Sequence, residues 1–111
     1  PPVAPSPIAP PGEAHGEHGK LPFETPRAAT IDDIARVLDD YANAARNAAA
    51  AGFDGVQIHA ANGYLIDEFL RSSSNRRDDE YGGPIGNRVR LLREVAERVI
   101  AEVGVDRVGV R

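Results

Sequence analysis

The 111-residue sequence contains no cysteine, methionine or tryptophan, and aromatic residues make up only 5% of it. Without cysteine, disulfide bonds and thiolate metal sites are excluded, and the cytoplasm is the default expectation for the location of the protein. No apolar run approaches the roughly 18 residues that a membrane-spanning helix requires, so no membrane partner is expected. The net charge of −4, with no run of basic residues, argues against nucleic acid as the main partner.

The remaining composition is typical of a folded segment, with 41% hydrophobic and 27% charged residues. The sequence begins with Pro1 and stops within the apolar stretch "RVGVR". Together with the lack of methionine, these two ends lead us to expect a piece of a longer protein.

Residues 1–29 contain all but one of the nine prolines. Proline fixes φ and removes a backbone donor, so this stretch is predicted to be a Pro/Gly-rich loop without a helix or a central strand. Within it, His15, Glu17 and His18 stand close together and raise the alternative of a metal site. Two histidines three residues apart in a glycine-rich loop are more typical of a plain surface, so no metal ion is predicted.

Helical and strand patterns alternate over residues 30–111. Thr30 and Asp33 form a capping-box pattern, which predicts the start of an amphipathic helix that ends at Gly52. The short run "DGVQIH" predicts a buried strand, and a second helix with Pro84 at its first position is followed by a predicted strand over 107–111. The apolar positions expected to face the core are Ile34, Leu38, Tyr41, Ala45 and Ala48 in the first helix, and Val89, Leu92, Val95, Val99 and Val103 in the second.

This order of elements predicts an α/β fold with two parallel strands and crossover helices. Since a complete (β/α)8 barrel takes roughly 250 residues, residues 30–111 would form a partial TIM barrel with flanking helices. Val56 and Ile58 share an aliphatic face of the first strand, whereas Gln57 and His59 share a face that becomes polar at the carboxyl end, and the second strand repeats the pattern. This asymmetry favours a barrel over a doubly wound sheet, which would need apolar residues on both faces.

Three polar side chains of different character follow the first strand in "HAANGY". His59 and Asn62 offer N–H donors for a carbonyl or an oxyanion, and the Tyr64 hydroxyl could deliver a proton as a general acid. Arg111, at the end of the next strand, adds a permanent positive charge. These groups suit a reaction in which negative charge builds on an enone or on a cofactor ring. The alternative is a β-hairpin that turns at Asn62-Gly63, although the helix-like spacing in "YLIDEFLRS" argues against it.

Residues 71–88 are dense in charge and include two adjacent glycines. They lack the G-x-x-x-x-G-K-[ST] pattern of a phosphate-binding loop. We expect charged side chains of this long loop to pair with one another and to hold the loop over the barrel mouth; these are Arg76, Arg77, Asp78, Asp79 and Glu80.

The segments "GFDGVQIHAANGYLIDEFL", "SNRRDDEYGGPIGNRVRLLREV" and "DRVGVR" closely resemble the old yellow enzyme family, whose members are FMN-dependent ene-reductases built on a (β/α)8 barrel. The combination of H-x-x-N-G-Y-L with D-E-Y-G-G-x-x-x-N-R carries the resemblance. The opening "PVAPSPIAPPGE" is similar to the loop that precedes this region in the family, so the likeness covers nearly the whole chain as a central segment of such an enzyme.

The resemblance implies a role for each of four residues. His59 and Asn62 match the pair that hydrogen-bonds the carbonyl or nitro oxygen of the substrate, and Tyr64 matches the proton donor to its α-carbon. Arg111 matches the arginine that lies against the flavin and steadies the anionic reduced ring. In such enzymes NAD(P)H reduces FMN, and the flavin then passes hydride to the β-carbon of an activated alkene.

The family's other flavin-binding segments have no counterpart in these residues. We therefore expect the isolated chain to be inactive and to need the rest of the barrel, or self-association, as a partner. Two rival hypotheses remain: a non-catalytic barrel fragment that only associates with a complementary fragment, and a dinucleotide-binding half-domain. The lack of G-x-G-x-x-G after either strand argues against the half-domain.

Overall fold

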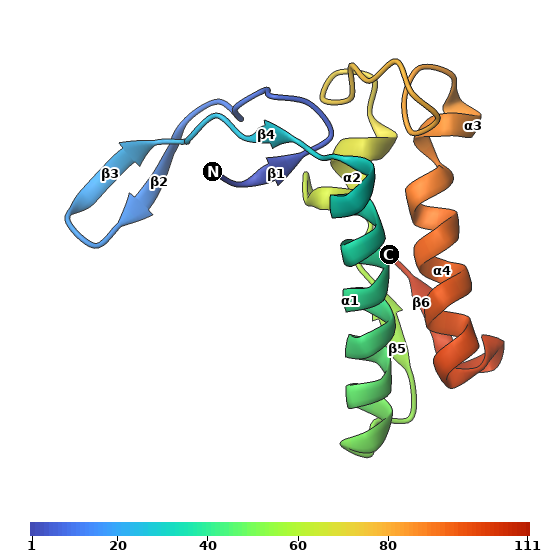
Figure 1. The fold of residues 1–111 in the computed structure, drawn as a ribbon. Coiled ribbons are helices and arrows are strands. Elements are labelled where there is room, and N and C mark those ends of the chain that lie inside the picture. Colours follow the sequence, from blue (N-terminus) through green and yellow to red (C-terminus); the bar gives the residue numbers. More distant parts are fainter.

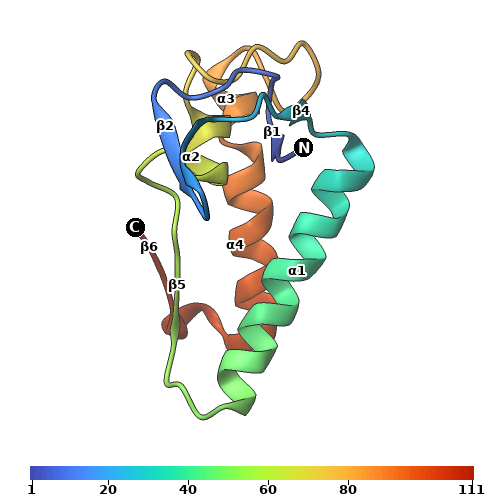
Figure 2. The ribbon, with the colours of Figure 1, turned by 90° about the vertical axis from the view of Figure 1, so that its left-hand side faces the viewer.

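The computed structural model describes every residue from Pro1 to Arg111. The two long helices, α1 (Ile31–Ala50) and α4 (Arg90–Val103), lie side by side in Figure 1. The strands β5 (Val56–Ile58) and β6 (Val108–Val110) pair in parallel and form a separate layer beside the helices in Figure 2. The helices therefore cover one face of the strand pair, which confirms the predicted α/β arrangement with parallel strands. None of the helices combines the length and apolarity needed to cross a membrane.

A complete capping box begins α1, as the sequence predicts. The Thr30 hydroxyl accepts the backbone N–H of Asp33 at 3.1 Å, and the Asp33 carboxylate accepts the N–H of Thr30 at 2.9 Å. Arg27 and Arg36 also pair with this carboxylate. The hydrogen bond from Arg27, supported by those from Thr30, holds the pKa of Asp33 well below its usual range. After the helix ends, Gly52 has a φ of 91°, a conformation that glycine adopts without steric cost.

The hydrophobic core lies where α1 and α4 meet the short helix α2 (Leu65–Leu70) and the inner face of β5. Five of the predicted core positions are only partly buried: Tyr41 and Ala48 on the first helix, and Val89, Leu92 and Val103 on the second. Leu91, at 1% exposure, fills the core position that the sequence pattern assigned to Leu92. Burial of one large aliphatic or aromatic side chain stabilises a fold by about 1.5–3 kcal/mol. The core consists of Ala29, Ile34, Leu38, Ala45, Ile58, Ile66, Phe69, Tyr81, Leu91, Val95 and Val99.

The strands are shorter than predicted, but their faces are arranged largely as expected. Ile58 is 3% exposed and belongs to the core, whereas Gln57 faces away from the helices and is exposed. Val108 packs against the core, as its position predicts. Val110 is the exception, because the residue is 53% exposed.

Residues 1–29, predicted as a loop without a helix or a central strand, contain more regular structure than a plain loop. The segment contains the strands β1 (Val3–Ala4), β2 (Glu13–Gly16), β3 (Gly19–Pro22) and β4 (Arg27–Ala28). β1 and β4 pair in parallel, while β2 and β3 form an antiparallel hairpin that projects away from the helices in Figure 1. Most of the prolines lie outside the hairpin, so its backbone N–H groups are free to pair.

The histidines of the hairpin belong to no cluster of possible metal ligands. His15 pairs with Lys20 across the hairpin, and His18 belongs to the connecting turn. No cluster of three or more histidine, aspartate or glutamate side chains in the chain could hold a metal ion.

The predicted second helix is divided in two. A short helix α3 (Ile85–Arg88) precedes α4, and Val89 lies between them. Pro84 is the N-cap residue with an extended ψ of 152°, not the first helical residue as predicted. Its carbonyl oxygen accepts a hydrogen bond from the N–H of Asn87 at 2.9 Å. Pro84 thus lies one position before the first helical residue, Ile85.

Candidate active site

Hydrogen bonds between β5 and β6 continue one residue beyond both strands. The N–H of Arg111 donates to Ile58 O at 3.0 Å, and the N–H of Ala60 donates to Arg111 O at 2.8 Å. These bonds extend the register that pairs Ile58 with Val110, and they set Arg111 opposite His59. Paired positions of neighbouring strands carry their side chains on one face, with the strands about 4.8 Å apart. His59 and Arg111 therefore share the face that the helices leave open.

A tight turn follows His59. The N–H of Tyr64 donates to Ala61 O at 3.3 Å, and both central residues are left-handed, with φ of 59° at Asn62 and 78° at Gly63. Positive φ at both central positions is typical of a type I′ turn. The Asn-Gly pair thus forms the turn that it predicts, but α2 begins directly afterwards. The hairpin alternative is therefore wrong.

The turn brings Tyr64 back over His59. The centres of their rings lie 5.3 Å apart, with the ring planes tilted by 60°. Tyr64 is 65% exposed, so its hydroxyl is accessible to a bound molecule. Asn62 is exposed as well, and no hydrogen bond joins its amide to the other three predicted site residues. The structure thus gathers His59, Tyr64 and Arg111, and it places Asn62 beside them in the turn.

Sequence reasoning missed Asp67, which lies beneath this turn. Its carboxylate accepts the N–H of Gly63 at 2.8 Å and Nε of Arg71 at 2.9 Å, while the residue is only 7% exposed. The hydrogen bond from Arg71 is the main reason why the pKa of Asp67 lies below its usual range. The one sequence signal for this role was the Asp67–Arg71 spacing of four residues on a predicted helix.

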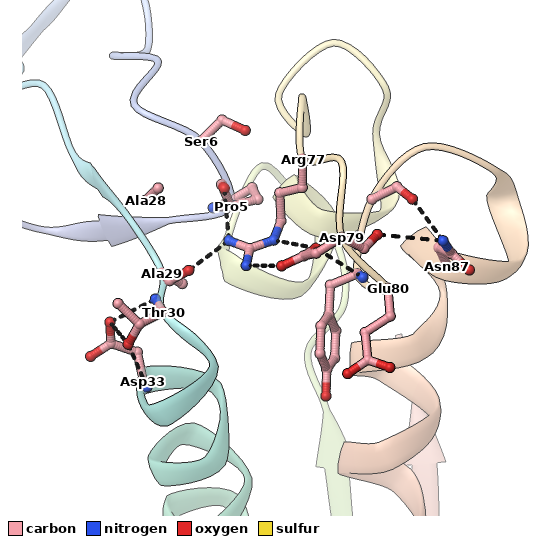
Figure 3. Close-up of polar contacts among 12 residues, drawn as sticks. Pro5, Ser6, Ala28, Ala29, Thr30, Asp33, Arg77, Asp79, Glu80 and Asn87 are labelled. Carbon is pink, nitrogen blue, oxygen red and sulfur yellow. Dashed lines mark hydrogen bonds and ion pairs between the residues drawn. The ribbon is translucent and has the colours of Figure 1, made fainter.

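The charged loop is held mainly by one of its arginines. Arg77 forms a double ion pair with Asp79, and its guanidinium also donates to Pro5 O at 3.1 Å and Ala29 O at 2.7 Å (Figure 3). The hydrogen bond from Arg77 is the main cause that lowers the pKa of Asp79. The expected pairing among the loop charges is therefore correct for these two residues, while the other three form no ion pair with one another.

Asn75 is a second residue of this loop that sequence reasoning missed. Its side chain is buried, and its amide donates to Phe69 O at 2.7 Å and Tyr81 O at 2.8 Å. Asn75 thus connects the end of α2, at Phe69, with Tyr81, which precedes α3 in the chain. No pattern around Asn75 in the sequence indicated this role.

Two grooves on the surface differ in whether they lie next to the candidate site. A groove of about 390 Å³ runs along α1 and β5, on the helix-covered face and away from His59 and Arg111. A second groove, of about 370 Å³, opens beside Gly63 between residues 8–11 and the end of α2. Glu68 lines the second groove, and burial raises the pKa of its carboxyl group. Only the second groove adjoins the turn.

The arrangement can act on a molecule that develops negative charge. An imidazole N–H and an amide N–H can donate to one oxygen, and a phenol near them can donate a proton. Arg111 supplies a cation on the same open face. These residues fit a flat, electron-accepting ring bound over the strand ends, because the face is free of helices and carries a permanent positive charge.

Known proteins resemble this chain over nearly its whole length. The profile of the NADH:flavin oxidoreductase / NADH oxidase family matches residues 2–111. A probable flavin mononucleotide-dependent alkene reductase of Leishmania infantum is 53% identical over 114 residues, which cover 98% of this chain and 31% of the relative.

Solved structures give the same picture. The old yellow enzyme homologue of Zymomonas mobilis superposes with a TM-score of 0.95 and 61% identity over 99% of this chain and 31% of that chain. Morphinone reductase in complex with tetrahydroNAD superposes with a TM-score of 0.92 and 44% identity, over 99% of this chain and 32% of its own. The chain thus spans about a third of the length of these relatives, and it belongs to the NADH:flavin oxidoreductase family that includes the old yellow enzymes.

Proposed function

We propose that this chain supplies the substrate-binding and proton-donating groups of a longer FMN-dependent ene-reductase, called here the intact flavoenzyme. That enzyme would reduce activated C=C bonds of α,β-unsaturated carbonyl or nitro compounds with NAD(P)H. The observation that carries the proposal is the pairing of His59 with Arg111 across the strand ends, with the Tyr64 ring 5.3 Å from the imidazole. A donor, an acid and a cation meet there on one open face.

Each of these residues has a defined task in the proposed reaction. His59 and Asn62 donate hydrogen bonds to the carbonyl or nitro oxygen, which stabilises the negative charge that grows there. Tyr64 donates its hydroxyl proton to the α-carbon. Arg111 would lie against FMN and favour its anionic reduced form. When bound, FMN supplies the hydride, which it receives from NAD(P)H.

We place β5 and β6 as neighbouring strands of a (β/α)8 barrel. Two features support this arrangement. Helices cover only one face of the strand pair (Figure 2), and His59, Tyr64 and Arg111 follow the carboxyl ends of the strands. Active sites of such barrels lie at that end. The remaining strands, with the other flavin contacts, would come from the rest of the intact flavoenzyme.

Replacement of Tyr64 by phenylalanine tests the proposal. In the intact flavoenzyme, Tyr64→Phe should slow reoxidation of the reduced flavin by an enone about 10²- to 10⁴-fold, because the proton donor is lost. Flavin reduction by NAD(P)H should change less than twofold, since no proton reaches the substrate in that half-reaction. Rapid-mixing absorbance measurements separate the two steps.

Tyr41→Phe is a matched control, because Tyr41 lines the groove on the helix-covered face. It should leave both half-reactions unchanged. If Tyr64→Phe slows both half-reactions equally, or neither of them, Tyr64 is not the proton donor.

A further inference from the structure

The turn that carries Asn62 and Tyr64 depends on one buried carboxylate. Oδ2 of Asp67 accepts the N–H of Gly63 at 2.8 Å, at the residue between Asn62 and Tyr64. No other side chain of the protein accepts a backbone N–H from residues 59–64. The turn's own backbone bond, from Tyr64 N to Ala61 O, is long at 3.3 Å. Asp67 therefore provides the shorter of the two bonds that hold the turn.

This turn needs such a bond because few other contacts hold it. Asn62 has a φ of 59°, a left-handed conformation that asparagine tolerates better than most residues but adopts less freely than glycine. Asn62 and Tyr64 are exposed, so little packing holds them in place. A carboxylate that accepts a backbone N–H forms one of the stronger hydrogen bonds in proteins.

The second oxygen of Asp67 is bound to a cation. Oδ1 accepts Nε of Arg71 at 2.9 Å, while the Asp67 side chain is 10% exposed and the Arg71 side chain 64% exposed. An ion pair four residues apart on a helix contributes little to stability by itself, and the Arg71 side chain is exposed enough to turn away if the charge is removed. The hydrogen bond from Gly63 to Oδ2 therefore does not depend on this pair.

We infer that Asp67 is a positioning residue, which fixes the Ala61–Tyr64 turn through the Gly63 N–H and so sets Asn62 and Tyr64 against a bound substrate. The inference rests on the proposed function, because the reaction to be positioned is the reduction of an activated alkene. Asp67 itself does not touch the substrate; it acts through the turn. A displacement of about 1 Å at a catalytic group can cost about 100-fold in rate.

Three variants of the intact flavoenzyme test this role. Asp67→Ala removes the acceptor and should slow flavin reoxidation by 2-cyclohexenone about 10- to 100-fold. Asp67→Asn keeps an acceptor of the same length without charge and should stay within about threefold of wild type. Asp67→Glu keeps the charge but moves the oxygen by one methylene, and should behave like the alanine variant. Asp78→Ala, at an exposed aspartate without an ion pair, is the matched control.

Two further readouts separate positioning from general damage. Amide hydrogen exchange at Gly63 should accelerate at least tenfold in Asp67→Ala and remain slow in Asp67→Asn, because only the latter retains the acceptor. Flavin reduction by NAD(P)H should stay within twofold of wild type in both. If Asp67→Ala does not fold, the reoxidation rates of Asp67→Asn and Asp67→Glu still test the positioning role, because the first should be close to wild type and the second slow. Rescue by Glu with failure of Asn would show a charge effect and overturn the inference.

The outcome can be told apart from a failure of the proposed function. If Tyr64→Phe leaves reoxidation unchanged, the proposed function fails whatever Asp67 does. If Tyr64→Phe slows reoxidation while Asp67→Ala does not, only the positioning role fails. Combined with Tyr64→Phe, Asp67→Ala should slow reoxidation less than it does alone. Full multiplication of the two effects would contradict a role that acts through Tyr64.

Discussion

The guanidinium of Arg77 donates a 2.7 Å hydrogen bond to the carbonyl oxygen of Ala29, which lies 48 residues earlier in the chain. The Arg77 side chain is only 9% exposed, and its charge lies 5.8 Å from the centre of the Phe69 ring. A largely buried, planar arginine that makes four side-chain hydrogen bonds thus joins the charged loop, the start of α1 and the core.

Arg77→Lys should therefore destabilise the intact flavoenzyme by about 1–3 kcal/mol. Lysine keeps the charge but cannot make the forked pattern of bonds, which leaves buried carbonyl oxygens unpaired. Arg76→Lys is the control at the neighbouring position, where only the backbone N–H bonds to Ser6. Its effect should stay within about 0.5 kcal/mol. Denaturant titration measures both, and equal midpoints for the two variants would contradict the assignment.

Gly82 should not tolerate alanine. A Cβ atom there would collide with the backbone carbonyl and the Cβ of Arg77, so Gly82→Ala should cost about 1–3 kcal/mol in the free energy of unfolding. At Gly86, within α3, a Cβ would meet nothing within 4 Å. Gly86→Ala should then be neutral, or stabilising by up to about 1 kcal/mol, because alanine favours a helix. Thermal unfolding compares the two; a harmless Gly82→Ala would show that the loop can shift.

Asn62 has two separable properties, its left-handed backbone and its amide donor. Asn62→Ala should lose both, whereas Asn62→Gly should lose only the donor. The alanine variant should therefore be less stable than the glycine variant by about 1–2 kcal/mol. Reoxidation by an enone should fall about 10²- to 10³-fold in both, since the donor is gone. Equal melting temperatures for the two variants would mean that the turn adopts another backbone conformation in Asn62→Ala, so that alanine avoids the left-handed region.

Acid should weaken the start of α1. Arg27, first among its partners, depresses the folded-state pKa of Asp33, so below about pH 4 the unfolded chain binds the proton more readily than the folded one. The contribution of Asp33 to stability is present above that pH and is lost as the pH falls towards the folded-state pKa. Asp33→Asn should be less stable than wild type at pH 7, and the difference should shrink between pH 5 and 3.

Urea midpoints at several pH values measure this difference. Asp32→Asn serves as the control, because Asp32 is exposed and outside the capping box. A difference between Asp33→Asn and wild type that is independent of pH would rule out the proposed linkage.

The isolated 111-residue chain should not bind FMN stoichiometrically at micromolar concentration. Among the residues of this chain only Arg111 is proposed to touch the flavin, and a single exposed cation provides little affinity. Quenching of flavin fluorescence during titration with the chain measures binding, with circular dichroism on the same sample. Saturable binding by a folded chain would mean that a flavin site assembles without the rest of the barrel.

Local patterns predicted much of the helical structure, because each depended on neighbours in the sequence. The capping box at Thr30 and the glycine at Gly52 delimited α1 correctly, and helical spacing outweighed the hairpin signal at Asn62-Gly63. The β2–β3 hairpin was missed because the prolines around it obscured a stretch in which Pro22, its last residue, is the sole proline. The proline content averaged over residues 1–29 could not reveal that residues 13–22 within this segment form two strands.

Long-range partners account for most of what the sequence left out. Strand parity placed His59 and Arg111 on one face, and the hydrogen bonds beyond the strands bear this out. The bonds of Arg77 to Pro5 and Ala29, by contrast, connect positions that no spacing rule relates. The charge pattern of the loop indicated that Arg77 pairs with a nearby acid. It did not indicate that Arg77 also bonds to carbonyl oxygens of the N-terminal segment.

The projecting hairpin is a part of the chain that can change without disturbing the rest. β2 and β3 pair only with each other, while the segments on either side of them are held by the β1–β4 pair and by Arg77. A hairpin that is longer, shorter or of different sequence could therefore be inserted at the same stem. Homologous enzymes would be free to diversify here, by insertion and deletion, while the residues around His59 keep their positions.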